Sequence, residues 1–476
     1  MATRIEQLMD DIRQQIASRA LTPGSRLPSV RARAQSAGVS VSTVVEAYDR
    51  LEAENIIVSR PGAGFFVSGP IAPLDLAQLG PQLERDIDPL WITRQALEAT
   101  SDMLKPGCGW LPPDWMYEEG IRRALRKAAR SESALLADYA TPAGNPELRQ
   151  LLTRRLAGYG MSVKPEQLLL ADSGTHAIDL ICRFFLEPGD SVLVDDPCYF
   201  NFHALLRAQR VNVIGVPWTA QGPDLDAFQQ ALTLHAPRLY ITNSGIHNPT
   251  GATLSPTTAH RLLKMAEDSD LVIVEDDIFA DLESSTAPRL AALDGLSRVM
   301  LIGSFSKTVS ASVRCGFIAA KPAWVDKLTD LKIATGFSSG QLAADVLLNI
   351  LKDSGYRRHI EAIKQRLADN RAEVISRLGQ LGIRPWLVPQ SGLFLWCELP
   401  EGMNAADVSR ACLSQGVVLA PGNTFSQSGT CDRFLRFNVS QSNDERIYTV
   451  LKKVMSSSAI NRAATYGRRN VNVIGT

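Results

Sequence analysis

Apolar residues near the start of the chain recur every three or four positions. This spacing predicts an amphipathic helix that ends before the proline- and glycine-containing stretch TPGSRLPS at 22–29. The apolar positions of this helix are Ile5, Leu8, Met9, Ile12 and Ile16. A short second helix is expected over 29–37, closed by Gly38, because glycine commonly ends helices.

A third helix is expected over 41–54, with Ser40 available as its N-cap. One face of this helix is expected to carry Val44, Val45, Tyr48 and Leu51. Two helices joined by a short glycine-containing turn are typical of a helix-turn-helix. Two short β-type runs follow, at 56–59 and 65–68, and the sequence RPGAG between them predicts a hairpin. Beside a recognition helix, such a hairpin forms a wing.

The pattern changes after residue 69. Residues 70–90 contain four prolines and no clear periodicity, which predicts a linker. From 91 to 455, apolar runs alternate with amphipathic stretches, which favours a parallel or mixed sheet covered by helices. The runs are QLLL (167–170), SVLV (191–194), RLYIT (238–242), LVIV (271–274) and RVMLI (298–302). Residues 456–476 are polar and unpatterned, which predicts a mobile tail.

Composition narrows the class of protein. The 476 residues are 45% hydrophobic and 21% charged, as in soluble globular proteins. No signal-peptide pattern and no run of eighteen apolar residues is present, so a cytoplasmic protein without a membrane partner is expected. The seven cysteines never form a CxxC pair and the histidines form no HExxH motif, so no metal site is expected.

Net charge gives little support to nucleic-acid binding by the whole chain, because 50 basic residues balance 50 acidic ones. Residues 1–69 contain eight arginines, no lysine and seven acids, which leaves a charge of about +1. The positions of these charged residues favour DNA binding more than their net charge does. The residues expected to contact DNA precede or line the second helix, begin the third helix or lie at the wing: Arg26, Arg31, Ser40, Ser42, Thr43 and Arg60. A small helical interaction module that does not bind DNA is the alternative.

Polar residues follow each apolar run of the large domain. Asp172, Ser173, Gly174 and Thr175 open a helix, where free N–H groups favour an anion. The later runs are followed by Tyr199, by Asn248 in HNPTG, by the acids EDD at 275–277, and by Lys307 in GSFSK. Taken singly, each has an ordinary explanation as a turn, a helix cap, a core tyrosine or a surface lysine.

Together these residues match the needs of pyridoxal phosphate. A lysine amine forms a Schiff base with the cofactor, and an acid holds the proton of its pyridine nitrogen. The phosphate needs N–H groups, hydroxyls and a guanidinium. Residues suited to the phosphate are Ser173, Gly174, Thr175, Ser304, Ser306 and Arg314.

On these motifs, residues 91–455 resemble an aspartate-aminotransferase-like, fold-type I pyridoxal phosphate domain, and residues 1–69 resemble a GntR-type winged helix. The whole chain resembles the MocR family of bacterial transcription regulators. The resemblance implies an α/β fold with a mostly parallel sheet and a smaller C-terminal α+β subdomain. It also implies roles for Lys307 as Schiff-base lysine, Asp276 on the pyridine nitrogen, Asn248 on the ring hydroxyl, Tyr199 on the ring, Tyr139 on the partner subunit's phosphate and Arg436 on a substrate carboxylate.

The chain departs from the resembled families at four positions. Phe279 stands where a tyrosine is common, and His176 where a glutamine is common. In the winged helix, Arg33 replaces an apolar residue and Val41 replaces an arginine that often begins the recognition helix. Transaminase turnover and base preference are therefore not transferred to this chain.

The resulting hypothesis is a homodimeric DNA-binding regulator that senses pyridoxal phosphate or a small amino compound through Lys307. Two alternatives remain open: a working aminotransferase with an accessory module, and a protein that buffers the cofactor.

Overall fold

The computed structural model describes residues 3–17, 21, 23–60, 62–68, 89–98, 102–131 and 133–457. This part of the chain folds into two compact units. Most of the expected linker and residues 458–476 of the expected tail lie outside the described residues. Among the described helices, none has the length and apolar character needed to cross a membrane.

The N-terminal unit has three helices and a two-stranded hairpin. Its elements are α1 (Arg4–Ala17), α2 (Val30–Ala37), α3 (Val41–Ala53), β1 (Ile57–Arg60) and β2 (Gly64–Val67). Gly38 ends α2 with φ +64°, a conformation that glycine adopts without steric cost. The side chain of Ser40 accepts a hydrogen bond from the Thr43 N–H and caps α3. The turn between these two residues sets the angle of the helix-turn-helix.

The core of this unit is formed where the three helices and the hairpin meet, and it includes Leu8, Ile12, Val44, Tyr48 and Leu51. The expectation for one residue is wrong: Val45 is exposed rather than packed with Val44 and Tyr48. The buried face of α3 passes through positions 44, 47, 48 and 51, and position 45 lies about 100° away from position 44 around the helix axis.

The second unit is built on an eight-stranded sheet with the order β3-β10-β9-β8-β7-β4-β5-β6. Strands β4, β7, β8 and β9 pair in parallel, whereas β10 is antiparallel to both β3 and β9. Its strands are β3 (Leu168–Ala171), β4 (Ser191–Asp196), β5 (Asn212–Thr219), β6 (Gly222–Pro223), β7 (Leu239–Thr242), β8 (Val272–Asp276), β9 (Val299–Ser304) and β10 (Gly316–Ala319).

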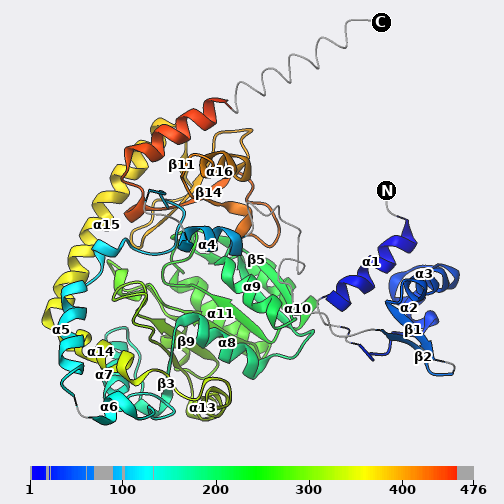
Figure 1. Cartoon of the computed structure of the whole chain (residues 1–476), viewed down its shortest axis with the longest axis horizontal. Helices are drawn as coiled ribbons and strands as arrows, with labels where there is room; N and C mark the ends of the chain where they lie inside the picture. The colour runs from blue at the N-terminus through cyan, green and yellow to red at the C-terminus, as the bar shows by residue number, and fades with distance from the viewer. Residues whose placement is uncertain are drawn as a thin grey trace, which may run out of the picture. The chain divides into compact units, whose positions relative to one another are not determined.

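The apolar residues of all five runs noted in the sequence lie in strands of this sheet or directly beside them, and all except Val272 are buried because helices cover both faces. The helices that precede or follow these strands (Figure 1) are α4 (Pro89–Glu98), α5 (Glu118–Ala128), α6 (Ser133–Ala137), α7 (Pro146–Ala157), α8 (Gly174–Phe185), α9 (Phe200–Ala208), α10 (Leu225–His235), α11 (Pro256–Asp268), α12 (Leu290–Asp294), α13 (Pro322–Gly336) and α14 (Gln341–Lys352).

A smaller antiparallel sheet follows, with the order β11-β12-β14-β13. The long helix α15 runs along the second unit from the region of α14 to the region of β11 (Figure 1). The elements of this part are α15 (Ser354–Gln380), β11 (Arg384–Pro385), β12 (Phe394–Glu398), α16 (Ala405–Leu413), β13 (Ala420–Pro421) and β14 (Phe434–Asn438), and residues 445–457 are helical. The structure thus confirms the expected fold class: a winged helix, a large, mostly parallel α/β sheet and a smaller α+β part.

Candidate functional site

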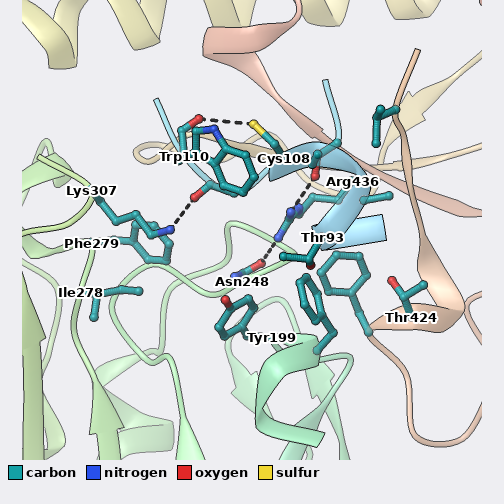
Figure 2. Close-up of a pocket in the computed structure, with 17 residues that line it drawn as sticks. Thr93, Cys108, Trp110, Tyr199, Asn248, Ile278, Phe279, Lys307, Thr424 and Arg436 are labelled. Carbon is teal, nitrogen blue, oxygen red and sulfur yellow. Dashed lines mark hydrogen bonds between the residues drawn. The ribbon is translucent and has the colours of Figure 1, made fainter. Parts of the chain in front are cut away.

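One pocket of the second unit brings together four residues expected from the sequence: Tyr199, Asn248, Lys307 and Arg436 (Figure 2). They come from four separate places, namely the loop between β4 and α9, the loop after β7, the loop after β9, and β14. The parallel register of β7, β8 and β9 places the carboxyl ends of these strands at one edge of the sheet. Such an edge is where α/β proteins bind ligands.

Lys307 lies in the loop that begins where β9 ends. Its Nζ donates a hydrogen bond to the backbone oxygen of Gly109 at 2.7 Å (Figure 2). Burial lowers the pKa of Lys307 to about 8, and the positive charge of Arg436 acts in the same direction. Near neutral pH a larger fraction of this amine is therefore neutral, and so nucleophilic, than of an ordinary lysine.

Asp276 ends β8 and is buried. Its Oδ1 accepts a hydrogen bond from the Ile278 N–H at 3.2 Å, and burial raises its pKa to about 7. No cation of the described chain forms an ion pair with this carboxyl, although Lys307 lies near enough to lower its pKa slightly. Asp276 is thus a buried acid suited to a cationic partner.

Arg436 lies on β14 with only 2% of its surface exposed. Its two terminal nitrogens donate to Oδ1 of Asn248 at 2.8 Å and to the backbone oxygen of Gly107 at 2.7 Å (Figure 2). The guanidinium also lies over the rings of Phe394 and Phe425. Burial lowers the pKa of Arg436 to about 10, and Nε has no hydrogen-bond partner among the described residues.

A buried guanidinium paired only with neutral groups favours an anionic ligand, because desolvation of the charge is otherwise poorly compensated. Asn248 is held against Arg436 in this arrangement, so its amide is shared between the guanidinium and the pocket. Tyr199 also lines the pocket, and burial raises the pKa of its hydroxyl, so the ring is present in its neutral form.

The residues expected to hold the phosphate form a second group next to this pocket. Ser173 caps α8 by accepting a hydrogen bond from the His176 N–H, and Ser304 Oγ donates to Ser306 Oγ at 3.2 Å. A side chain placed on Gly174 would begin 3.7 Å from Cβ of Ser304, so the start of α8 lies close to the end of β9. Thr175 and Arg314 are exposed, and Arg314 lies close enough to lower the pKa of Lys307.

Tyr139 is not brought to the pocket within one chain. Its side chain is 78% exposed, and its ring packs on Phe337 with 4.8 Å between the ring centroids. Phe279 does line the pocket, where it meets Phe394 edge to face, so its position offers no hydroxyl to a ligand. His176 accepts a hydrogen bond from the Asp172 N–H through Nδ1.

Several other pocket residues are not among those predicted from the sequence. They include Gly109 and, as Figure 2 shows, Cys108 and Trp110. They belong to the segment KPGCGWL at 105–111, in which a side chain on Gly107 would meet the backbone of Leu419 and Ala420 at 2.5 Å. Two glycines around one cysteine are a signal of close backbone approach, and this signal was available in the sequence.

In the N-terminal unit, the residues expected to contact DNA lie on α2, at the start of α3 and near the hairpin, and all are exposed except Thr43, which is half-buried. Ser40 Oγ lies 2.8 Å from Ser42 Oγ and 2.7 Å from Thr43 Oγ1. The guanidinium of Arg60 covers the ring of Phe66 in the hairpin. The backbone of Arg26 forms an isolated antiparallel β-bridge with Phe66. Arg31 is exposed on α2.

Arg33 instead pairs with Asp11 of α1. This ion pair between α1 and α2 explains why an arginine stands where an apolar residue is common.

The fold and the site define a class of protein: a winged helix-turn-helix joined to an aminotransferase-type α/β domain. Residues 116–454 match the model of aminotransferase class I and II, and the chain belongs to this family. Residues 4–67 match the model of bacterial regulatory proteins of the gntR family. The domain content expected of a MocR-type, DNA-binding transcription regulator is confirmed, and pyridoxal phosphate is the cofactor that such an aminotransferase domain takes.

Similar proteins include both regulators and enzymes. The chain is 29% identical to the uncharacterized HTH-type transcriptional regulator YdcR of Escherichia coli, over 95% of this chain and 98% of that protein. It is also 29% identical to 2-aminoadipate transaminase of Thermus thermophilus, over 72% of this chain and 88% of that protein. The structure of LysN, an alpha-aminoadipate aminotransferase of Thermus thermophilus complexed with N-(5'-phosphopyridoxyl)-L-leucine, aligns with a TM-score of 0.70 and 26% identity, over 77% of this chain and 95% of that chain.

Proposed function

We propose that this transcription regulator holds pyridoxal phosphate at Lys307 and binds an amino compound beside it. We further propose that binding of the amino compound changes the affinity of the winged helix for DNA. One observation carries the proposal: among the described residues that line this pocket, the only charged groups are the amine of Lys307 and the guanidinium of Arg436, which is hydrogen-bonded to neutral groups alone. A ligand with a carboxylate and an amine fits this pair, because its carboxylate would bind Arg436 and its amine would exchange with the amine of Lys307 at the cofactor aldehyde.

The donor set of this site fits pyridoxal phosphate. When bound, the cofactor supplies an aldehyde that condenses reversibly with primary amines and a protonated pyridine ring that withdraws electrons. The pyridinium is the cation that buried Asp276 lacks. Lys307 would hold the aldehyde carbon, Asn248 the ring hydroxyl and Tyr199 the ring face. The phosphate would contact Ser173, Gly174, Thr175, Ser304, Ser306 and Arg314, with Tyr139 reaching the phosphate of the partner subunit.

The rest of the pocket suggests the class of effector. Apart from Lys307 and Arg436, the described lining residues are uncharged, and those beyond Arg436 are mainly apolar: Ala96, Phe200, Val418, Ala420 and Phe425. An amino acid whose side chain is uncharged and apolar fits this surface, because a second carboxylate or amine would be buried without a partner.

Helix α4 offers a route from the pocket to the DNA-binding unit. It contributes Thr93 and Ala96 to the lining, and it begins at Pro89, directly after the segment that joins it to the winged helix. A ligand that packs on α4 can therefore shift this helix, which is joined through that segment to the winged helix.

The test is DNA binding with and without the ligands. A duplex selected from a random pool by the full-length protein is titrated against the apo-protein, the pyridoxal phosphate form, and this form with leucine, phenylalanine, glutamate or lysine. We expect the apolar amino acids to change the Kd for DNA and the charged ones to have little effect. Identical DNA affinity in every state would contradict the sensing proposal, as would an unchanged response in the variant Lys307→Ala.

A second candidate function is aminotransferase turnover, which is favoured by the presence of Lys307, Arg436 and nearby Asp276 at one site. Phe279 argues against efficient turnover, because no hydroxyl supports the ring oxygen from this position. Single-turnover absorbance with candidate amino acids separates the two functions. Fast conversion to the pyridoxamine form without DNA binding would favour the enzyme.

We further propose that the protein is a cytoplasmic homodimer. Tyr139 and Phe337 form an aromatic pair on the surface of the single chain, and exposed apolar groups of this kind commonly mark an interface. Two winged helices on one duplex would gain affinity through effective concentration. Sedimentation of the wild type and of a Tyr139→Glu, Phe337→Glu double variant tests this, and a monomeric wild type would contradict it.

A further inference from the structure

The expected recognition helix α3 exposes two valines. Val41 is 51% exposed and Val45 is 41% exposed, and neither belongs to the core of the N-terminal unit. They are four residues apart, so they lie one above the other on the same helix face. The packed face of α3, which includes Val44, Tyr48 and Leu51, points another way.

Folding does not account for these two side chains. Valine is a weaker helix former than alanine or the long polar residues, since its branched Cβ loses rotamer freedom in a helix. At an exposed helix position a valine therefore gives no packing and costs some helix stability. Val41 also occupies the first position of α3, immediately after the capping residue Ser40.

The surroundings of the two valines suit a nucleic acid. Hydroxyls of Ser40, Ser42 and Thr43 gather at the start of α3, and no acid occurs in its first turn. Exposed Arg31 lies on the preceding helix of the helix-turn-helix. Glu46, about 100° around the helix from Val45, is paired with Arg50 at 2.8 Å, and Asp49, the acid on the same stripe as the two valines, lies one turn beyond Val45 in the later part of α3.

We propose that Val41 and Val45 read the 5-methyl groups of thymines in the major groove. The inference rests on the proposed DNA-binding function and specifies its target. Thymine is the base that presents a methyl group in this groove, and apolar side chains contact it there. Hydroxyls and arginines around the valines position the helix on phosphates, which carry no sequence information.

The spacing sets the expected pattern in the target. Two residues four positions apart are separated by about 6 Å along a helix axis, which is close to two base-pair steps of about 3.4 Å. The half-site is therefore expected to contain two thymines about two steps apart, on either strand.

The experiment uses the full-length, pyridoxal phosphate-loaded protein and a duplex that it selects from a random pool. Each thymine of this duplex is replaced in turn by deoxyuridine, which removes the methyl group and leaves base pairing unchanged. We expect two positions per half-site at which the Kd rises about three- to fivefold, the value of one buried methyl group. Uniform affinity across all deoxyuridine duplexes would overturn the proposal.

Protein variants assign the contacts. Val41→Ala and Val45→Ala are each titrated against the thymine and the deoxyuridine duplexes. Each double-mutant cycle combines one valine change with one methyl removal and measures the coupling energy between the two groups. We expect each alanine to weaken binding to the thymine duplex and to lose most of its effect on one particular deoxyuridine duplex. Because both valines are exposed, alanine at these sites leaves the fold intact. Val388→Ala, at a 63% exposed valine of the second unit, is the matched control and is expected to show no coupling.

Two failures are distinguishable. If the protein enriches no duplex from the pool and retards none at low salt, the DNA-binding function itself fails, and this proposal fails with it. If it binds a selected duplex tightly but all cycles show no coupling, DNA binding stands and methyl reading by these valines is wrong.

Discussion

Three neighbouring acids at the end of β8 have three different environments. Glu275 accepts hydrogen bonds from the N–H groups of Leu290 and Ala291 and so caps α12. Asp277 pairs with Arg289 at 2.7 Å. Asp276, between them, is bonded to no cation of the described chain and is left for the ligand site. The sequence marked the triplet as unusual, but which acid serves the site depends on partners that are twelve or more residues away.

The Arg289 cluster allows a prediction of stability. Arg289 is buried, donates to Asp277 and lies 3.0 Å from Glu283. Arg289→Leu leaves two buried carboxylates without their cation, and the free energy of unfolding of the second unit is expected to fall by about 3–5 kcal/mol. Urea denaturation followed by tryptophan fluorescence measures this. Arg122→Leu, which breaks an exposed pair with Glu118, should leave the midpoint nearly unchanged; equal shifts in the two variants would contradict the prediction.

The lowered pKa of Lys307 predicts the pH dependence of cofactor attachment. Only the neutral amine reacts, so the rate of pyridoxal phosphate binding to the apo-protein should rise with pH and level off above the pKa of about 8. An ordinary lysine would keep gaining reactivity to about pH 10.4. Stopped-flow absorbance measures the midpoint.

A variant of Arg436 supplies the control for this pH profile. Arg436→Leu removes a positive charge that lowers the pKa of Lys307, so the midpoint should move to higher pH. A midpoint that moves to lower pH would contradict the electrostatic explanation.

Among helices and strands, fully buried apolar runs are the most reliable predictors of β-strands in this sequence. β7 and β9 match the expected runs closely because parallel strands covered on both faces are apolar throughout. β10 was not predicted, since its four residues GFIA become a strand only through antiparallel pairing with β3 and β9. β5 was also missed, because its glycine and proline hide the pattern. The pocket wall formed by α4 and the loop at 107–110 likewise depends on contacts over long sequence separations.

The cap of α3 gives a prediction at the same scale. Ser40 Oγ accepts the Thr43 N–H at 3.1 Å, and loss of such a cap costs about 1 kcal/mol. In the full-length protein, Ser40→Ala should speed amide exchange in α3 by about fivefold, as measured by hydrogen-exchange mass spectrometry. Ser40→Asn keeps a capping oxygen and should restore protection; no difference between the two variants would show that the cap does not stabilise α3.

In the full-length protein, sensing requires that binding of the amino acid and binding of DNA are energetically coupled. If an apolar amino acid changes the Kd for DNA by some factor, DNA must change the Kd for that amino acid by the same factor, because both follow from one free energy of coupling. Typical couplings correspond to about 5- to 150-fold. Two titrations check this: DNA binding at saturating amino acid, and cofactor absorbance at saturating DNA. Unequal factors would show that the amino acid acts outside the pocket of Lys307 and Arg436, whereas equal factors that disappear in Arg436→Leu would connect the guanidinium on β14 to the DNA response.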